Sequence, residues 1–95
     1  LAKPTPALGV EMGWQDSQCV MIVTEKGMVA CGVIDKAVME RAGAAIAIAR
    51  GTKEVPLVTT ADLLGASIQD MTAKAADYGV TIGMTGAEAL AMLSE

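Results

Sequence analysis

The residue best suited to chemistry in this chain is Cys31, which stands beside Gly32 and four positions ahead of Asp35. Its thiolate could act as a nucleophile, with Gly32 allowing close substrate approach and Asp35 or Asp62 as acid–base partner. Such a thiolate normally needs a neighbouring histidine, lysine, arginine or helix N-terminus. The chain has no histidine, and Asp35 would itself oppose thiolate formation. A buried structural cysteine is therefore the favoured interpretation of Cys31.

The carboxylates Asp35 and Asp62 have a structural explanation that needs no substrate. Both stand where a helix is predicted to begin, and there a carboxylate accepts hydrogen bonds from free N–H groups and interacts favourably with the helix dipole. Helix capping accounts for both residues. The catalytic hypothesis for this pair is consequently the weaker one.

A short glycine motif, with Gly83, Thr85 and Gly86, precedes the last predicted helix. Its exposed N–H groups could bind an anion, and Arg50 could supply the countercharge. This Gly-x-x-Gly pattern is shorter than a phosphate-binding loop, and a Thr85 side chain that caps its own helix explains it as well. These four residues are the candidate ligand-binding residues.

Composition excludes several classes of function. The absence of histidine removes imidazole catalysis and histidine-ligated metal sites, and the seven methionines are scattered rather than grouped around a cofactor. We therefore expect no metal and no cofactor. A net charge of −4 and only two aromatic residues, Trp14 and Tyr78, argue against nucleic-acid binding.

The chain is nevertheless rich in apolar residues. Of its 95 residues 53% are hydrophobic, and its mean hydropathy is +0.46. No apolar run is long enough to span a membrane, and the first residues lack the pattern of a signal peptide. The two cysteines are expected to be reduced thiols of a cytoplasmic protein. We expect the excess apolar surface to be buried against other copies of the chain.

The first half of the chain predicts an extended arm over residues 1–6 and then antiparallel strands. Strands are predicted over three segments, namely residues 8–14, 19–24 and 28–34. With a turn at Lys26-Gly27, Cys31 would lie opposite Ile22. Cys19 and Cys31 would then point to opposite faces of the sheet, which predicts that no disulfide joins them.

The rest of the chain predicts one more strand and several short helices. A helix is expected from Asp35 to Ala42, ended by Gly43. Residues 44–49 favour a strand, with an alanine-rich helix as the competing interpretation, and a loop and a short extended piece over 55–58 follow. Three capping boxes then predict helices that end at Gly65, cover residues 68–78 and cover residues 86–93. The boxes are Thr59 with Asp62, Ser67 with Asp70 and Thr85 with Glu88. The fold class is therefore α+β: a single small domain over residues 1–95, with N-terminal antiparallel strands in a mixed sheet and three to four short helices.

Four motifs together resemble the YunC-like family, a bacterial and archaeal domain of unknown function. They are Cys31-Gly32-x-x-Asp35, Thr60-x-Asp62-Leu63-Leu64, Ala75-Ala76-x-x-Gly79 and Gly83-Met84-Thr85-Gly86-x-Glu88-Ala89-Leu90. The resemblance extends from about Val20 to the end, except that residues 52–57 depart from the family pattern. It implies an α+β domain whose N-terminal β region mediates homo-oligomerisation as a tetramer, and it implies no activity.

Two hypotheses about function follow. The favoured one is a non-catalytic homo-oligomeric module, whose partner is a second copy of itself and which could bind a small ligand between subunits. The alternative is a small enzyme that uses Cys31 with Asp35 or Asp62 in thiol or acyl chemistry. No nucleic acid or membrane is expected as a partner.

Overall fold

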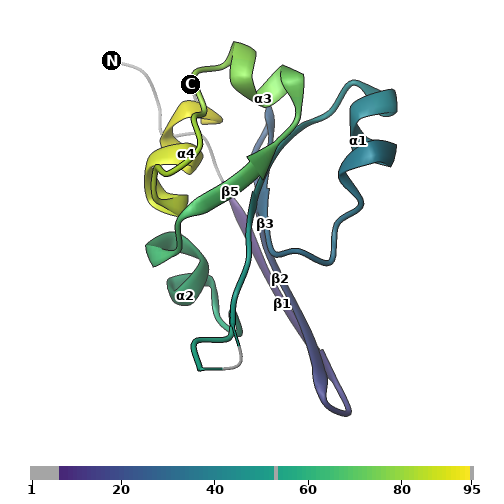
Figure 1. Cartoon of the computed structure of the whole chain (residues 1–95), viewed down its shortest axis with the longest axis vertical. Helices are drawn as coiled ribbons and strands as arrows, with labels where there is room; N and C mark the ends of the chain where they lie inside the picture. The colour runs from purple at the N-terminus through teal and green to yellow at the C-terminus, as the bar shows by residue number, and fades with distance from the viewer. Residues whose placement is uncertain (1–6, 53, 95) are drawn as a thin grey trace.

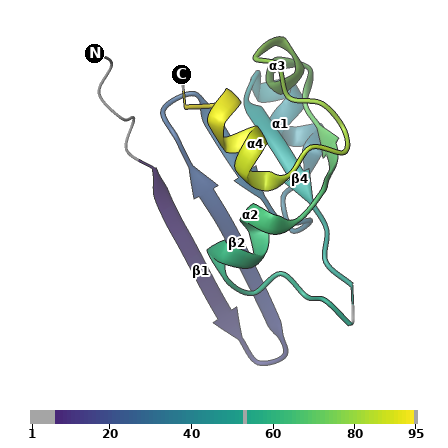
Figure 2. The same ribbon diagram turned by 90° about the vertical axis from the view of Figure 1, so that its left-hand side faces the viewer.

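The alternating apolar residues near the N-terminus form a long β-hairpin. In the computed structural model, which describes residues 7–52 and 54–94, β1 (Leu8–Trp14) pairs antiparallel with β2 (Ser17–Val23). A tight turn at Gln15 and Asp16 joins the strands, and Gln15 adopts a positive φ of 50°. The hairpin projects beyond the body of the molecule (Figures 1 and 2). The predicted arm of residues 1–6 lies outside the described residues.

Three further strands extend the hairpin into a mixed sheet. They are β3 (Gly27–Ala30), β4 (Ala45–Ala49) and β5 (Ile68–Met71). In the described residues the sheet has the order β1-β2-β3-β4-β5, with β3 and β4 parallel and the other neighbours antiparallel. The parallel pair needs a crossover, which α1 (Lys36–Ala42) provides. The predicted piece over residues 55–58 forms no strand.

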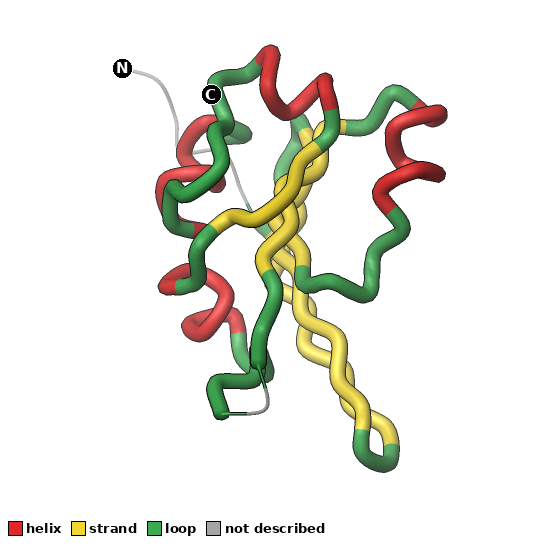
Figure 3. The backbone as a smooth tube through the Cα atoms, viewed as in Figure 1, coloured by secondary structure: helices red, strands yellow, loops and turns green. Residues whose placement is uncertain are grey.

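Helices cover the two faces of the sheet unequally. On one face lie α2 (Thr60–Gly65) and α4 (Gly86–Met92), while α1 lies on the other face (Figures 1 and 3). The short α3 (Ala73–Asp77) packs near β4. The buried side chains beneath α2 and α4 form the main core, and they include Val20, Ile22, Val29, Leu63 and Leu93. The α+β fold predicted from the sequence is confirmed.

The predicted helix over residues 68–78 is wrong in its first half. Ile68–Met71 instead form β5, which pairs antiparallel with β4. The helix begins only after Thr72, whose hydroxyl accepts a hydrogen bond from the Ala75 N–H. Ser67 therefore does not cap a helix. The apolar residues of this segment fit a helix as well as a strand, and the open edge of β4 decides between them.

The third predicted strand is too long, and its register is different. β3 ends at Ala30, and the turn residues are Glu25 and Lys26, closed by a hydrogen bond from the Thr24 N–H to the Gly27 carbonyl. Ile22 consequently pairs with Val29 rather than with Cys31. This shift of two residues keeps the same side chains on each face. Cys31 lies directly after the end of β3.

One face of the hairpin is not covered by any helix of the described residues. Alternate residues of a strand share a face, and the observed register places Leu8 beside Val23 and Val10 beside Met21. We call this the open face, and its large apolar side chains are Leu8, Val10, Met12, Trp14, Met21 and Val23. The opposite face of the hairpin packs against α2. No helix of the described residues is long and apolar enough to cross a membrane.

Candidate functional site

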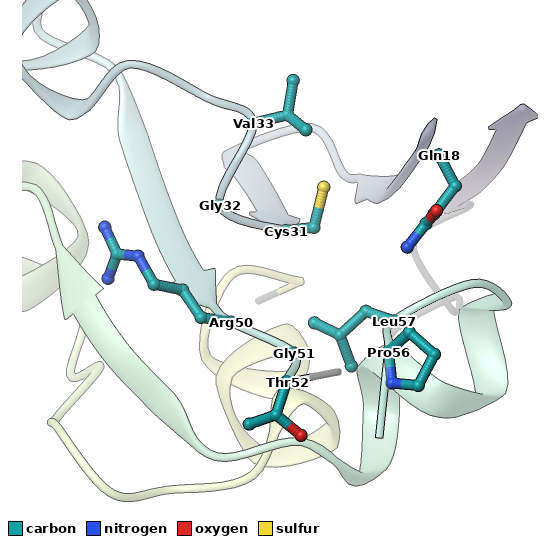
Figure 4. Close-up of a pocket in the computed structure, with 9 residues that line it drawn as sticks. All are labelled: Gln18, Cys31, Gly32, Val33, Arg50, Gly51, Thr52, Pro56 and Leu57. Atoms are coloured by element: carbon teal, nitrogen blue, oxygen red, sulfur yellow. The ribbon is translucent and has the colours of Figure 1, made fainter. Parts of the chain in front are cut away.

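A pocket of about 350 Å³ lies where the carboxyl ends of β3 and β4 meet a following loop. Its nine lining residues are Gln18, Cys31, Gly32, Val33, Arg50, Gly51, Thr52, Pro56 and Leu57 (Figure 4). A pocket of this volume is within the range of small-molecule sites. Thr52, Pro56 and Leu57 come from the loop between β4 and α2.

The parallel pairing of β3 and β4 brings two of the candidate residues together. Ala30 pairs with Ile48 near the ends of the two strands, so the residues that follow leave the sheet at the same edge. Cys31 and Arg50 consequently line the same pocket. Gly32 lies against Arg50, because a Cβ atom at Gly32 would lie 3.2 Å from Arg50 Cγ. A larger side chain at position 32 would displace the arginine.

The Cys31 thiol is held against strand β2. The Cys31 N–H donates to the Val20 carbonyl at 3.0 Å, and the Val20 N–H donates to Cys31 Sγ at 3.5 Å. The sulfur thus takes the place of a backbone carbonyl oxygen as the hydrogen-bond acceptor for β2. Both thiols are free. Burial raises the pKa of Cys19, and the charge of Cys31 and a hydrogen bond with Cys31 raise that pKa further.

Asp35 and Asp62 do not line this pocket, and both are occupied as helix caps. Asp35 Oδ1 accepts from the N–H groups of Ala37 and Val38 at the start of α1. Asp62 completes a capping box with Thr59, as the sequence predicts. Hydrogen bonds from the Thr59 and Val58 N–H groups hold the pKa of Asp62 below its ordinary value. Neither carboxylate is placed to serve Cys31.

The glycine motif before α4 uses its own N–H groups internally. The Gly83 N–H donates to the Ile68 carbonyl, and the Gly86 N–H donates to the Ala66 carbonyl. Thr85 and Glu88 form the predicted capping box, which lowers the pKa of Glu88. Gly86 is required by packing, because a Cβ atom there would overlap the Leu63 carbonyl oxygen. Gly83, Thr85 and Gly86 therefore lie apart from the pocket that contains Arg50.

An ion-pair cluster beside the pocket was not anticipated from the sequence. Asp70 Oδ1 lies 3.1 Å from Lys36 Nζ, and Asp70 Oδ2 lies 4.0 Å from Arg50 Nη2. The hydrogen bond from Lys36, with one from the Met71 N–H, lowers the pKa of Asp70. The only sequence signal for Asp70 was a capping box that does not form. Among the residues that the structure describes, no group of three or more histidine, cysteine or acidic side chains could hold a metal ion.

Comparisons with known proteins give a family and a fold. Residues 30–93 match the model of a domain of unknown function, DUF1805. No curated protein matches the chain. A crystal structure of a protein of unknown function from Thermoplasma acidophilum is similar, with a TM-score of 0.74 and 15% sequence identity over 99% of each chain. At this identity the likeness shows a shared fold.

Proposed function

The chain belongs to the DUF1805 family of domains of unknown function, and from this premise we propose that it is a non-catalytic homo-oligomeric module. Its copies associate through the open face of the β1–β2 hairpin. The observation that carries this proposal is the exposure of large apolar side chains on that face. Leu8, Met12 and Trp14 are 65%, 49% and 52% exposed.

The chemistry of the open face favours a second copy over a different partner. No β1 or β2 residue on this face carries a charge, because the one charged residue of the two strands, Glu11, belongs to the opposite face. A charged partner would find no complementary group there. A self-complementary apolar patch can instead bury itself against an identical patch across a twofold axis. Within the described residues β1 is also an edge strand of the sheet, and such an edge can pair with another strand.

The number of copies rests on the family resemblance. The YunC-like family, which the chain resembles, is compatible with DUF1805. That resemblance implies that the N-terminal β region joins four copies into a tetramer. We propose four copies on that ground, and a cytoplasmic location because both cysteines are free thiols.

The pocket supports a second part of the proposal, which is a small ligand bound beside Cys31 and Arg50. Arg50 offers a cation whose side chain is 47% exposed and whose pairing with Asp70 is long, at 4.0 Å. A small molecule with an acidic group would suit this arrangement. The alternative of an enzyme that uses Cys31 with Asp35 or Asp62 has less support, since both carboxylates are engaged as helix caps.

Light scattering tests the assembly. We expect a mass well above the 9.7 kDa of one chain at micromolar concentration, and a shift to the monomer in the variant Met12→Lys. Met12 is chosen because a lysine there can reach water in the monomer. A lysine at a buried position of the same hairpin, such as Ile22, would disturb the fold itself. The control is Ile82→Lys, which places the same charge on an exposed apolar residue of the loop before α4.

Two outcomes would overturn the proposed assembly. One is a monomer mass for the unaltered protein. The other is an assembly that Met12→Lys leaves intact while its circular dichroism matches that of the unaltered protein.

A further inference from the structure

The pocket wall carries one thiol and a second thiol lies next to it. Cys31 is 6% exposed and lines the pocket, while Cys19 is 2% exposed and does not line it. Two hydrogen bonds join Cys31 to Val20. The Cys31 N–H donates to the Val20 carbonyl, and the Val20 N–H donates to the Cys31 sulfur. Cys19 is the residue directly before Val20. The Cys31 sulfur therefore lies beside the backbone that carries Cys19.

This arrangement arises because Cys31 has left the strand. A regular antiparallel pair would point the two side chains to opposite faces. At Cys31 the sulfur instead takes the position of a hydrogen-bond acceptor in the ladder with β2, so it lies near the plane of the sheet. A disulfide requires Cα atoms about 4.4–6.8 Å apart, which is the spacing of close neighbours on adjacent strands. Cys31 also acts on Cys19 through its charge and a side-chain hydrogen bond, which requires the two side chains to be near neighbours.

We propose that Cys31 and Cys19 form a redox-active dithiol that exchanges with small disulfides entering the pocket. The Cys31 thiolate attacks one sulfur of the disulfide, forms a mixed disulfide and releases the first small thiol. Cys19 then attacks the Cys31 sulfur, forms the Cys19–Cys31 bond and releases the second thiol. In total two protein thiols lose two electrons and two protons, and the disulfide is reduced to two thiols.

Position and environment assign the order of the two steps. Cys31 is the thiol that an incoming disulfide meets, because it forms part of the pocket wall. Cys19 lies behind it, and burial raises the pKa of Cys19, so that Cys19 stays protonated longer. Cys31 therefore reacts first and Cys19 resolves the mixed disulfide. Cys19 shares the open face of the hairpin with Met12, its partner in the register, whereas Cys31 lines the pocket, which none of the large open-face side chains does.

Redox titration with oxidised glutathione tests the proposal. The unaltered protein should lose the mass of two hydrogens, and a proteolytic map should place the bond between Cys19 and Cys31. Half-oxidation in the folded protein should need a ratio of oxidised to reduced glutathione at least about tenfold lower than in urea, because the fold holds the thiols together. An equal ratio in both conditions, or bonds only between chains, would overturn the proposal.

Two matched variants test the order of the steps. Cys19→Ala should accumulate a stable adduct of one glutathione on Cys31, since no second thiol can release it. Cys31→Ala should form its adduct on Cys19 at least about tenfold more slowly, because Cys19 is shielded. Equal rates in the two variants would refute the assigned order. The titration of the unaltered protein decides the proposal even where a variant fails to fold.

Discussion

The carboxylate of Glu11 caps a helix that lies 49 residues away in the chain. Glu11 Oε2 accepts a hydrogen bond of 2.7 Å from the N–H of Thr60, the first residue of α2. Close packing accompanies this bond, because a Cβ atom at Gly9 would lie 3.0 Å from Thr60 Cγ2. The hairpin is thereby fixed to the helical layer on one face, which leaves its other face open.

Replacing Glu11 with alanine should therefore loosen the hairpin. We expect the free energy of unfolding to fall by about 1 kcal/mol, as for the loss of a helix cap. Urea denaturation of Glu11→Ala measures it. The control Glu25→Ala, in the exposed turn between β2 and β3, should be nearly neutral; an equal loss in both variants would argue against a specific cap.

The hydroxyl of Thr72 is a buried link between three segments. It donates to the Ala44 carbonyl at 2.6 Å and accepts from the N–H groups of Ile46 and Ala75. Thr72→Val keeps the shape but leaves these backbone groups without a partner, at a cost of about 2–3 kcal/mol. Thr72→Ser keeps the hydroxyl and should lose less. Thermal denaturation that ranks the serine variant below the valine variant would contradict this account.

Gly86 should tolerate no side chain. A Cβ atom would overlap the Leu63 carbonyl oxygen where α4 crosses α2, so Gly86→Ala should destabilise the fold by about 1–3 kcal/mol. Gly65 gives a matched control, because it ends α2 and has no atom within 4 Å of the position that an added methyl group would take. Gly65→Ala should change the urea midpoint little. Similar urea midpoints for Gly86→Ala and Gly65→Ala would show that α2 and α4 can move apart without loss of stability.

Stability should decline in acid through three carboxylates. Hydrogen bonds and ion pairs lower the pKa values of Asp62, Asp70 and Glu88 in the folded chain. A group with a lowered folded pKa stabilises the fold above its unfolded pKa, and this contribution is lost as the pH falls through the folded value. The loss should therefore begin near the ordinary values of 4.5 for Glu88 and 3.8 for the two aspartates.

Urea unfolding at neutral pH and at about pH 3 measures this dependence. The variant Asp62→Asn with Glu88→Gln should be less stable than the unaltered protein at neutral pH and should lose less stability in acid. Equal acid losses would mean that other groups control the transition.

Local signals in the sequence determined the helix starts that depend on near neighbours. The capping boxes of Thr59 with Asp62 and of Thr85 with Glu88 form as predicted, because each involves residues three positions apart. The cap at Asp35 and the glycine end of α1 at Gly43 also follow from residues within one turn. These features need no contact from elsewhere in the chain.

Only the tertiary structure decided the features that depend on distant partners. Ile68–Met71 became a strand because the edge of β4 was available to them, and Cys31 lies after the end of β3, where its sulfur accepts from the Val20 N–H. The meeting of Cys31 with Arg50 requires β3 and β4 to run parallel. Hydrophobic pattern specifies which side chains are buried, but it does not specify which strand edges meet. Sequence therefore determined the helix starts at Asp35, Thr59 and Thr85, whereas long-range backbone pairing placed the thiols and built the pocket.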